Sequence, residues 1–249
     1  MYKKLLLLLA VMFCCTGFKV PNIDVEKALD AAGDAYKAAT LTDKDIQQLG
    51  KQSADEMDSQ NKIAASSDAY AKRLAKIVKG LEKEDGLKLN FKVYLVRDVN
   101  AFALPDGSVR VFAGLMDIMT DDELFFVIGH EIGHVKNGDS MDAYRVAYTA
   151  SATRKGAAAA GGAAAKLSAS QLGEIGEAVL NAQFSQSQES AADLYGFNLM
   201  KKYKKDTASA VSGLKKLGGS GQEASTLESL LSSHPEPAKR AAKLDSLRK

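Results

Sequence analysis

Two histidines and one glutamate in the middle of an apolar segment are the residues of this chain best suited to chemistry by type and spacing. His130 and His134 are four positions apart, so on a helix they lie one above the other on a single face. Two imidazole nitrogens presented in this way can bind one metal ion, usually zinc. Glu131 then lies beside the ion, where it can hold and deprotonate a water molecule. The alternative is a pair of core histidines with hydrogen bonds of their own, but these are two of only three histidines in the chain.

A zinc ion in a hydrolytic site takes a third protein ligand and leaves one position for water. The remaining histidine, His234, is one candidate, and an acidic residue on a later helix is the other. In the segment QESAAD, Glu189 and Asp193 share a helical face. If Glu189 binds the metal, Asp193 can accept the N–H of a liganding imidazole and fix its tautomer. The alternative for these two residues is a solvated acidic pair.

The HExxH motif lies in a segment with clear signals for both ends of a helix. Thr120 and Glu123 form a capping box at its start, and Asn137–Gly138 is a helix stop. The residues between them are mostly apolar, which is typical of a core helix. Gly133 in the interior costs about 1 kcal/mol relative to alanine, so we expect it to make room for another element.

The residues before this helix have the pattern of a small sheet. Apolar and polar residues alternate over 88–96, which predicts a half-buried strand, and two short strands, 101–104 and 109–112, flank a tight turn. We expect a small antiparallel sheet beside the HExxH helix. Helical spacing is found elsewhere, over residues 24–81, 172–202 and 207–217 and in a terminal segment through Arg240. The predicted fold class is therefore α+β and mainly helical.

The first 15 residues have the pattern of an export signal. Lys3 and Lys4 precede an apolar run, 5–13, that is too short to cross a bilayer. Cys14 and Cys15 follow the run and are the only cysteines, which excludes a disulfide framework in the body of the chain. The arrangement resembles a bacterial lipoprotein signal, in which a cysteine after the apolar run carries a lipid anchor. The alternative is an ordinary cleaved signal with two incidental cysteines, because the residues before them are larger than a lipidation site prefers.

Four motifs occur in the same order as in a known family. They are NAFALPDGSVRVFAG, HEIGH, ESAAD and SHPEPAKR. With these motifs the chain resembles the minigluzincin zinc metalloproteases, which include HtpX, the CAAX prenyl endopeptidase and the periplasmic proteases BepA and LoiP. The resemblance runs from about Leu41 to the C-terminus and is closest to the compact, LoiP-like lipoprotein form. It implies a zincin-like catalytic domain that binds one zinc ion through His130, His134 and Glu189, with Glu131 as general base.

The resemblance also implies roles for residues outside HExxH. Asp193 is at the position often assigned as proton donor, whereas our own reasoning makes it the orienter of an imidazole. His234 is expected near the metal, either as a donor to the developing oxyanion or as an inhibitory fourth ligand, and Arg240 and Tyr195 are further candidates for the donor. Many relatives have a histidine where this chain has Asp139, which is not a ligand in the family pattern.

Length, charge and motifs together define an expected organisation and function. Residues 1–15 are expected to be the export signal, 16–40 a linker or helix, and 41–249 the zinc metallopeptidase domain. The formal net charge of +2 gives no field that would recruit nucleic acid. We expect an endopeptidase on the periplasmic side of the cell envelope, lipid-anchored to a membrane, that cleaves misfolded or unassembled envelope proteins. The alternative is a non-proteolytic periplasmic chaperone or assembly factor that uses the same groove, against which the intact Glu131 argues.

Overall fold

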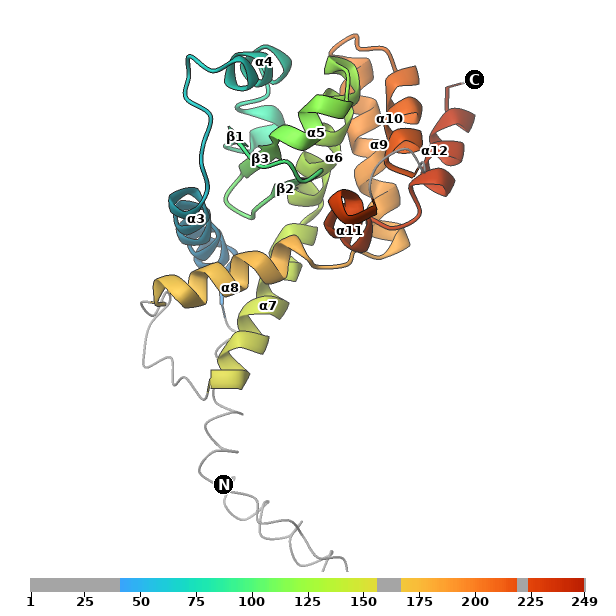
Figure 1. The fold of residues 1–249 in the computed structure, drawn as a ribbon. Helices are drawn as coiled ribbons and strands as arrows, with labels where there is room; N and C mark the ends of the chain where they lie inside the picture. The colour runs from blue at the N-terminus through green and yellow to red at the C-terminus, as the bar shows by residue number, and fades with distance from the viewer. Residues whose placement is uncertain (1–40, 156–166, 219–223, 249) are drawn as a thin grey trace, which may run out of the picture.

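The computed structural model describes residues 41–155, 167–218 and 224–248, in which helices surround one small sheet (Figure 1). In chain order the elements are α3 (Asp43–Gln60), α4 (Ala69–Ile77), the 3₁₀ helix η1 (Glu84–Gly86), β1 (Asn90–Tyr94), β2 (Ala101–Ala103), β3 (Ser108–Phe112), α5 (Ala113–Ile118), α6 (Asp121–Asn137), α7 (Asp139–Lys155), α8 (Ala169–Leu180), α9 (Gln186–Lys202), α10 (Ala208–Gly218), α11 (Ala224–Ser233) and α12 (Pro237–Ser246). This architecture confirms the predicted α+β, mainly helical fold class. The predicted export signal and the linker up to residue 40 lie outside the described residues. Within the described ranges no helix is both long and apolar enough to cross a membrane.

The three strands form a mixed sheet in the order β1-β3-β2. β2 and β3 are an antiparallel hairpin, as expected, and Gly107 in their turn has a φ of +88° and leaves no room for a side chain against Lys88. β1 pairs with β3 in parallel, with Asn90 opposite Ser108, so the prediction of an antiparallel sheet is wrong for this strand. The chain reverses before β2 and again before β3, and β3 then inserts between the other two strands. Alternating polarity encodes neither the order of strands nor their direction.

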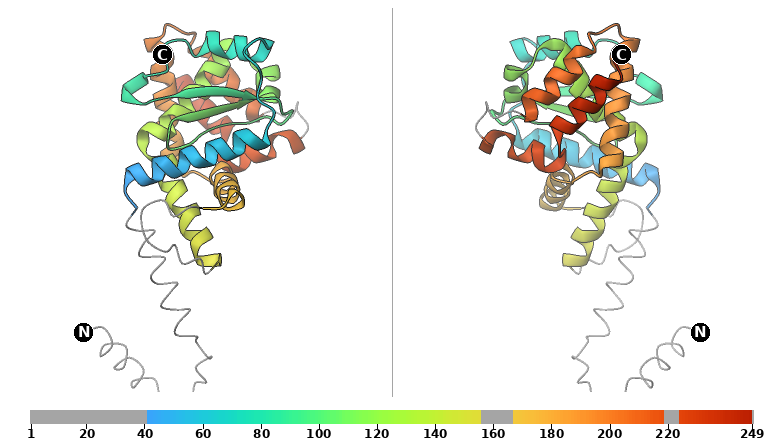
Figure 2. Two further views of the ribbon diagram at one scale, coloured as in Figure 1. Left: turned by 90° about the vertical axis from the view of Figure 1, so that its left-hand side faces the viewer. Right: turned by 90° about the vertical axis from the view of Figure 1, so that its right-hand side faces the viewer.

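Helices cover both faces of the sheet. Tyr94 and Phe102 belong to one buried cluster with Leu49 of α3, whereas Val93 and Val111 belong to a second cluster with the apolar residues of α6. The left view of Figure 2 shows α3 lying alongside the strands, and the right view shows α9, α10 and α12 on the opposite side of the molecule. The sheet therefore lies between two helical layers, one that contains α3 and one that contains α6.

Helix α6 begins and ends where the sequence predicts. Thr120 is its N-cap and forms a capping box with Glu123, and Gly138 ends it in the left-handed conformation at φ 85°. Every residue from Glu123 to His134 is buried. The HExxH motif therefore lies inside the core, where its polar side chains need partners.

Small residues allow α9 to approach α6 until their backbones are in contact. A Cβ atom added to Gly133 would lie 2.9 Å from the Cα of Ala192, and one added to Gly196 would lie 2.9 Å from the backbone nitrogen of His130. These separations are shorter than any ordinary Cβ contact. The predicted role of Gly133 is thus confirmed, and the first turns of α9 lie against the face of α6 that carries the motif.

The C-terminal third is more interrupted than the sequence pattern indicates. The predicted helical region over 172–202 divides into α8, which ends at Leu180, and α9, which Ser185 caps through a capping box with Gln188. Helix α11 was not predicted. It ends at Ser233, and the loop that follows leads into α12 at Pro237. Both interruptions place loops beside the HExxH helix.

Candidate metal centre

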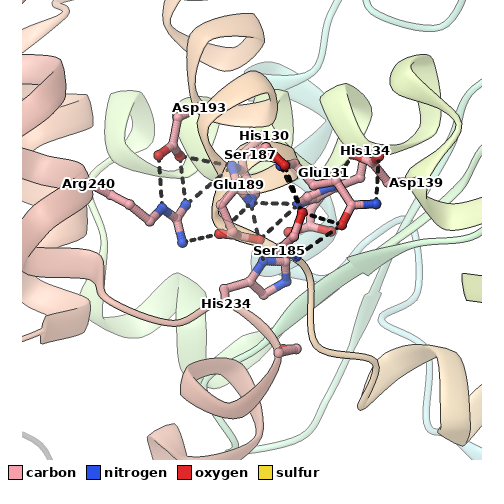
Figure 3. Close-up of polar contacts among 12 residues, drawn as sticks. His130, Glu131, His134, Asp139, Ser185, Ser187, Glu189, Asp193, His234 and Arg240 are labelled. Carbon is pink, nitrogen blue, oxygen red and sulfur yellow. Dashed lines mark hydrogen bonds and ion pairs between the residues drawn. The ribbon is translucent and has the colours of Figure 1, made fainter.

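Four side chains from three parts of the chain meet at the buried face of α6 (Figure 3). His130 and His134 come from α6, Glu189 comes from the first turn of α9, and His234 comes from the loop between α11 and α12. Their ligand atoms all lie within 4.8 Å of one another, and all four residues are buried. The site therefore gathers all three histidines of the chain around one carboxylate.

The separations between these atoms fit the ligand shell of a zinc ion. His130 Nε2 lies 3.0 Å from His134 Nε2 and 3.2 Å from His234 Nδ1. Glu189 Oε1 lies 2.9 Å from His234 Nδ1 and 3.3 Å from His134 Nε2. Zinc bonds of about 2.0–2.1 Å in a tetrahedron place neighbouring ligand atoms about 3.3 Å apart. Three imidazoles and a carboxylate are also a donor set that zinc accepts.

The outer nitrogen of His130 faces a buried pair of opposite charges. His130 Nδ1 lies 3.0 Å from Asp193 Oδ1, and Arg240 of α12 binds both oxygens of Asp193, at 2.8 Å and 2.6 Å. Burial opposes ionisation of Asp193, but hydrogen bonds from Arg240 and His130 outweigh it and lower its pKa to about 2. Arg240 also forms an ion pair with Glu189. Asp193 is therefore an anion whose Oδ1 can accept a hydrogen bond from Nδ1 of His130, which is the geometry that an orienting carboxylate needs.

The outer nitrogen of His134 faces a second carboxylate. His134 Nδ1 lies 2.9 Å from Asp139 Oδ2, and Gln188 Nε2 donates to the other oxygen of Asp139 at 3.0 Å. Phe184 stacks on the ring of His134, with centroids 4.0 Å apart. Burial alone would lower the pKa of His134, but Asp139 and Glu189 reverse the direction and raise it to about 9. A metal ion that binds Nε2 must therefore displace a proton.

Neighbouring groups also determine the protonation states of Glu189 and His130. Burial favours the neutral form of Glu189, but hydrogen bonds from His134 and His234 outweigh it and hold the pKa of this carboxyl below its usual range. Burial and then the charge of Arg240 lower the pKa of His130, which favours a neutral ring. An ionised carboxylate and a neutral imidazole are the forms that bind zinc.

Of the three remaining candidate residues, Glu131 and Arg240 lie at the site and Tyr195 does not. Glu131 is buried beside the ligands, with Oε1 3.6 Å from His234 Nε2. Arg240 is at the site, but its guanidinium is engaged by carboxylates. The hydroxyl of Tyr195 donates to Asp85 of η1 at 3.0 Å, so Tyr195 is not placed to stabilise an oxyanion.

Two contacts of His134 were not predicted from the sequence. Asp139 was noted only as a departure from the family pattern, although its position directly after the α6 stop is a signal for contact with the last turn of that helix. Phe184 was counted with the apolar residues of the predicted helix over 172–202, but it lies in the loop between α8 and α9, where it stacks on His134.

The chain has extensive similarity to known peptidases. Residues 68–248 match the family model described as Peptidase family M48. Metalloprotease YcaL of Escherichia coli (strain K12) is 42% identical over 221 residues, which is 88% of this chain and 86% of YcaL. Metalloprotease LoiP of the same organism is 40% identical over 240 residues, 96% of this chain and 94% of LoiP. A Protease HtpX homolog from Sulfurovum sp. (strain NBC37-1) is 37% identical over 79 residues, 29% of this chain and 28% of that protein.

These matches confirm the predicted family, and the buried histidine and glutamate cluster provides a fitting place for the predicted single zinc ion. The chain therefore belongs to peptidase family M48 and is a zinc metalloendopeptidase.

Proposed function

We propose that this endopeptidase cleaves misfolded or unassembled proteins of the bacterial cell envelope, with His130, His134 and Glu189 as its zinc ligands. The observation that carries the ligand assignment is the convergence of their donor atoms on the buried face of α6. Glu131 lies on the same helix and outside the ligand set, which suits it to act as general base. The export signal predicted for residues 1–15 supports the envelope location.

Each side chain at the site is proposed to have a separate role in peptide hydrolysis. Bound zinc supplies a water molecule of lowered pKa and polarises the peptide carbonyl. Glu131 accepts the proton of the attacking water and delivers it to the leaving amine. Asp193 is held ionised by Arg240 and keeps the ring of His130 in the tautomer that leaves Nε2 free. We assign Asp193 this orienting role rather than that of proton donor.

His234 is proposed to be a removable fourth ligand that keeps the enzyme inactive until substrate moves its loop. Its Nδ1 lies within hydrogen-bonding distance of both His130 Nε2 and Glu189 Oε1, which places it inside the ligand shell rather than outside it. Four protein ligands are typical of structural zinc sites, whereas catalytic sites keep a position for water. Departure of His234 would open that position beside Glu131.

The proteolytic function is tested by removal of the metal. Purified protein is expected to digest casein or an unfolded outer-membrane protein, to lose this activity in a chelator, and to regain it when zinc is restored, because the ligand set is required for water activation. Appearance of fragments on a gel is the measurement. A chaperone using the same groove would bind the unfolded protein and leave it intact in every condition.

Attachment to a membrane is proposed to require the cysteines that follow the apolar run. Replacement of both Cys14 and Cys15 by serine is expected to abolish lipid labelling and move the protein from the membrane fraction to the soluble fraction, because the thiol is the site of acylation. Metabolic labelling with a fatty acid and fractionation are the measurements. Failure of the unaltered protein to incorporate the label would contradict this proposal and leave the peptidase assignment intact.

A further inference from the structure

Asp139 is a buried carboxylate for which the proposed reaction has no use. It is the first residue of α7, directly after Gly138 ends α6, and only 7% of it is exposed. Its two oxygens have different partners. Oδ2 lies 2.9 Å from His134 Nδ1, and Oδ1 accepts from Gln188 Nε2 at 3.0 Å. Figure 3 shows Asp139 next to His134, on the side of the ring away from His234.

The contact with Asp139 determines which nitrogen of His134 can bind a metal ion. A carboxylate only accepts hydrogen bonds, so the nitrogen that faces it, Nδ1, carries the ring proton. In the neutral ring, which is the form that binds a metal ion, the lone pair is then on Nε2, the atom that faces His130 and Glu189. A negative charge behind the ring also makes Nε2 a stronger base and a better metal ligand.

Gln188 connects this contact to the helix that carries Glu189. Its Oε1 accepts from the backbone N–H of Ser185 at 2.9 Å and from the Ser185 hydroxyl at 2.8 Å, as part of the cap of α9. Its Nε2 donates to Asp139, which contacts His134. The hydrogen bonds therefore run from the start of α9 to the ring of the second ligand, beside the glutamate that supplies the third.

We propose that Asp139 is a positioning residue of the metal centre, which fixes the tautomer and orientation of His134 and, through Gln188, the placement of that ring relative to Glu189. The inference rests on the proposed ligand set. Each of the two imidazole ligands would then have a carboxylate at its Nδ1. Asp193 of α9 is the partner of His130, and Asp139 of α7 is the partner of His134. Outer carboxylates of this kind contribute about 10–100-fold to metal affinity.

The first test compares two substitutions in the first turn of α7. Asp139→Asn is expected to weaken zinc binding by at least about tenfold in a chelator competition with the full chain. Asp142→Asn removes the same charge from an exposed position of that turn and is expected to change the affinity by less than about twofold. Equal affinities for the two variants would overturn the proposal.

Gln188→Glu provides a second variant whose two possible effects have opposite signs. A glutamate retains the oxygen that caps Ser185, but it replaces the donor that faces Asp139 by an acceptor. An added negative charge by itself strengthens cation binding, whereas a displaced Asp139 weakens it. We expect zinc affinity to fall by about threefold or more. A rise would mean that charge rather than positioning governs the site.

The tautomer of His134 can be read directly in the unaltered protein, and proton exchange can then be compared in the two α7 variants. The chain has three histidines, so the zinc-loaded full chain labelled with ¹⁵N in its imidazoles gives a spectrum that can be assigned. We expect His134 to bind through Nε2 and to carry a slowly exchanging proton on Nδ1, which exchanges faster in Asp139→Asn and not in Asp142→Asn. Coordination through Nδ1, or unchanged exchange, would overturn the inference. An unaltered protein that binds no zinc would instead contradict the ligand set itself.

Discussion

Replacement of Glu131 by glutamine is expected to leave zinc bound and to reduce peptide hydrolysis by at least about a hundredfold, the usual effect of losing a general base. Glutamine has nearly the same size and hydrogen-bonding reach as glutamate, so it fits the buried position of Glu131, a residue that is only 5% exposed. A glutamine amide cannot accept the proton of the attacking water, so the rate falls. Residue 131 is not among the four residues whose atoms converge on the metal position, so zinc binding is retained. Zinc content per chain and the initial rate of casein digestion are the measurements.

Two controls separate this chemical effect from loss of the metal or of the fold. Glu177→Gln makes the same change at an exposed position of α8 and is expected to retain full activity. His134→Ala removes a proposed ligand and is expected to lose both zinc and activity. Digestion at the normal rate by Glu131→Gln would show that the base has been assigned to the wrong residue.

The parts of this site that the sequence predicts are those encoded within one helix. The capping box at Thr120 and the stop at Gly138 lie a few residues from the motif, and both are found in the structure. The spacing of Glu189 and Asp193 likewise fixes their common face as soon as α9 forms. Gly133 was informative for a different reason, since a glycine inside a helix is unfavourable unless a neighbour requires the space.

The parts that the sequence does not predict depend on how distant elements meet. The direction of β1 follows from insertion of β3 between β1 and β2, which no local pattern encodes. Tyr195 is close to Asp193 along α9 but on another face, so its hydroxyl reaches η1 rather than the metal position. Which of the two proposed roles suits His234 also depended on tertiary structure, because its loop comes from the far end of the chain.

The loop that carries His234 is held at the site by contacts that can be broken at modest cost. The backbone N–H of Phe184 donates to the carbonyl of Ser233 at 3.2 Å, and Gln186 Nε2 donates to Glu236 at 2.9 Å. Hydrogen bonds of this kind contribute about 1 kcal/mol each. Glu236 has a φ of 59°, a left-handed conformation that costs free energy in a residue other than glycine. Movement of the loop would withdraw the imidazole.

Replacement of His234 by alanine is therefore expected to raise the rate of digestion by at least about tenfold, which corresponds to about 1.4 kcal/mol of barrier. Alanine removes the fourth donor atom and leaves His130, His134 and Glu189 to hold the metal, so the position for water no longer has to be opened by movement of the loop. The measurements are kcat/KM on an unfolded protein and the zinc content, which is expected to stay at about one per chain.

The direction of the change in His234→Ala discriminates between the two roles that the family resemblance allows. An oxyanion donor lost from the site would lower the rate, typically by about a hundredfold or more, because the transition state would lack a hydrogen bond. Removal of an inhibitory fourth ligand would raise the rate.

The double variant Glu131→Gln/His234→Ala is expected to be inactive, since the gain must act through the same general base. A rate that does not change would mean that His234 neither blocks the metal nor touches the transition state. We expect the rise, because His234 Nδ1 lies 2.9 Å from Glu189 Oε1, among the ligand atoms themselves.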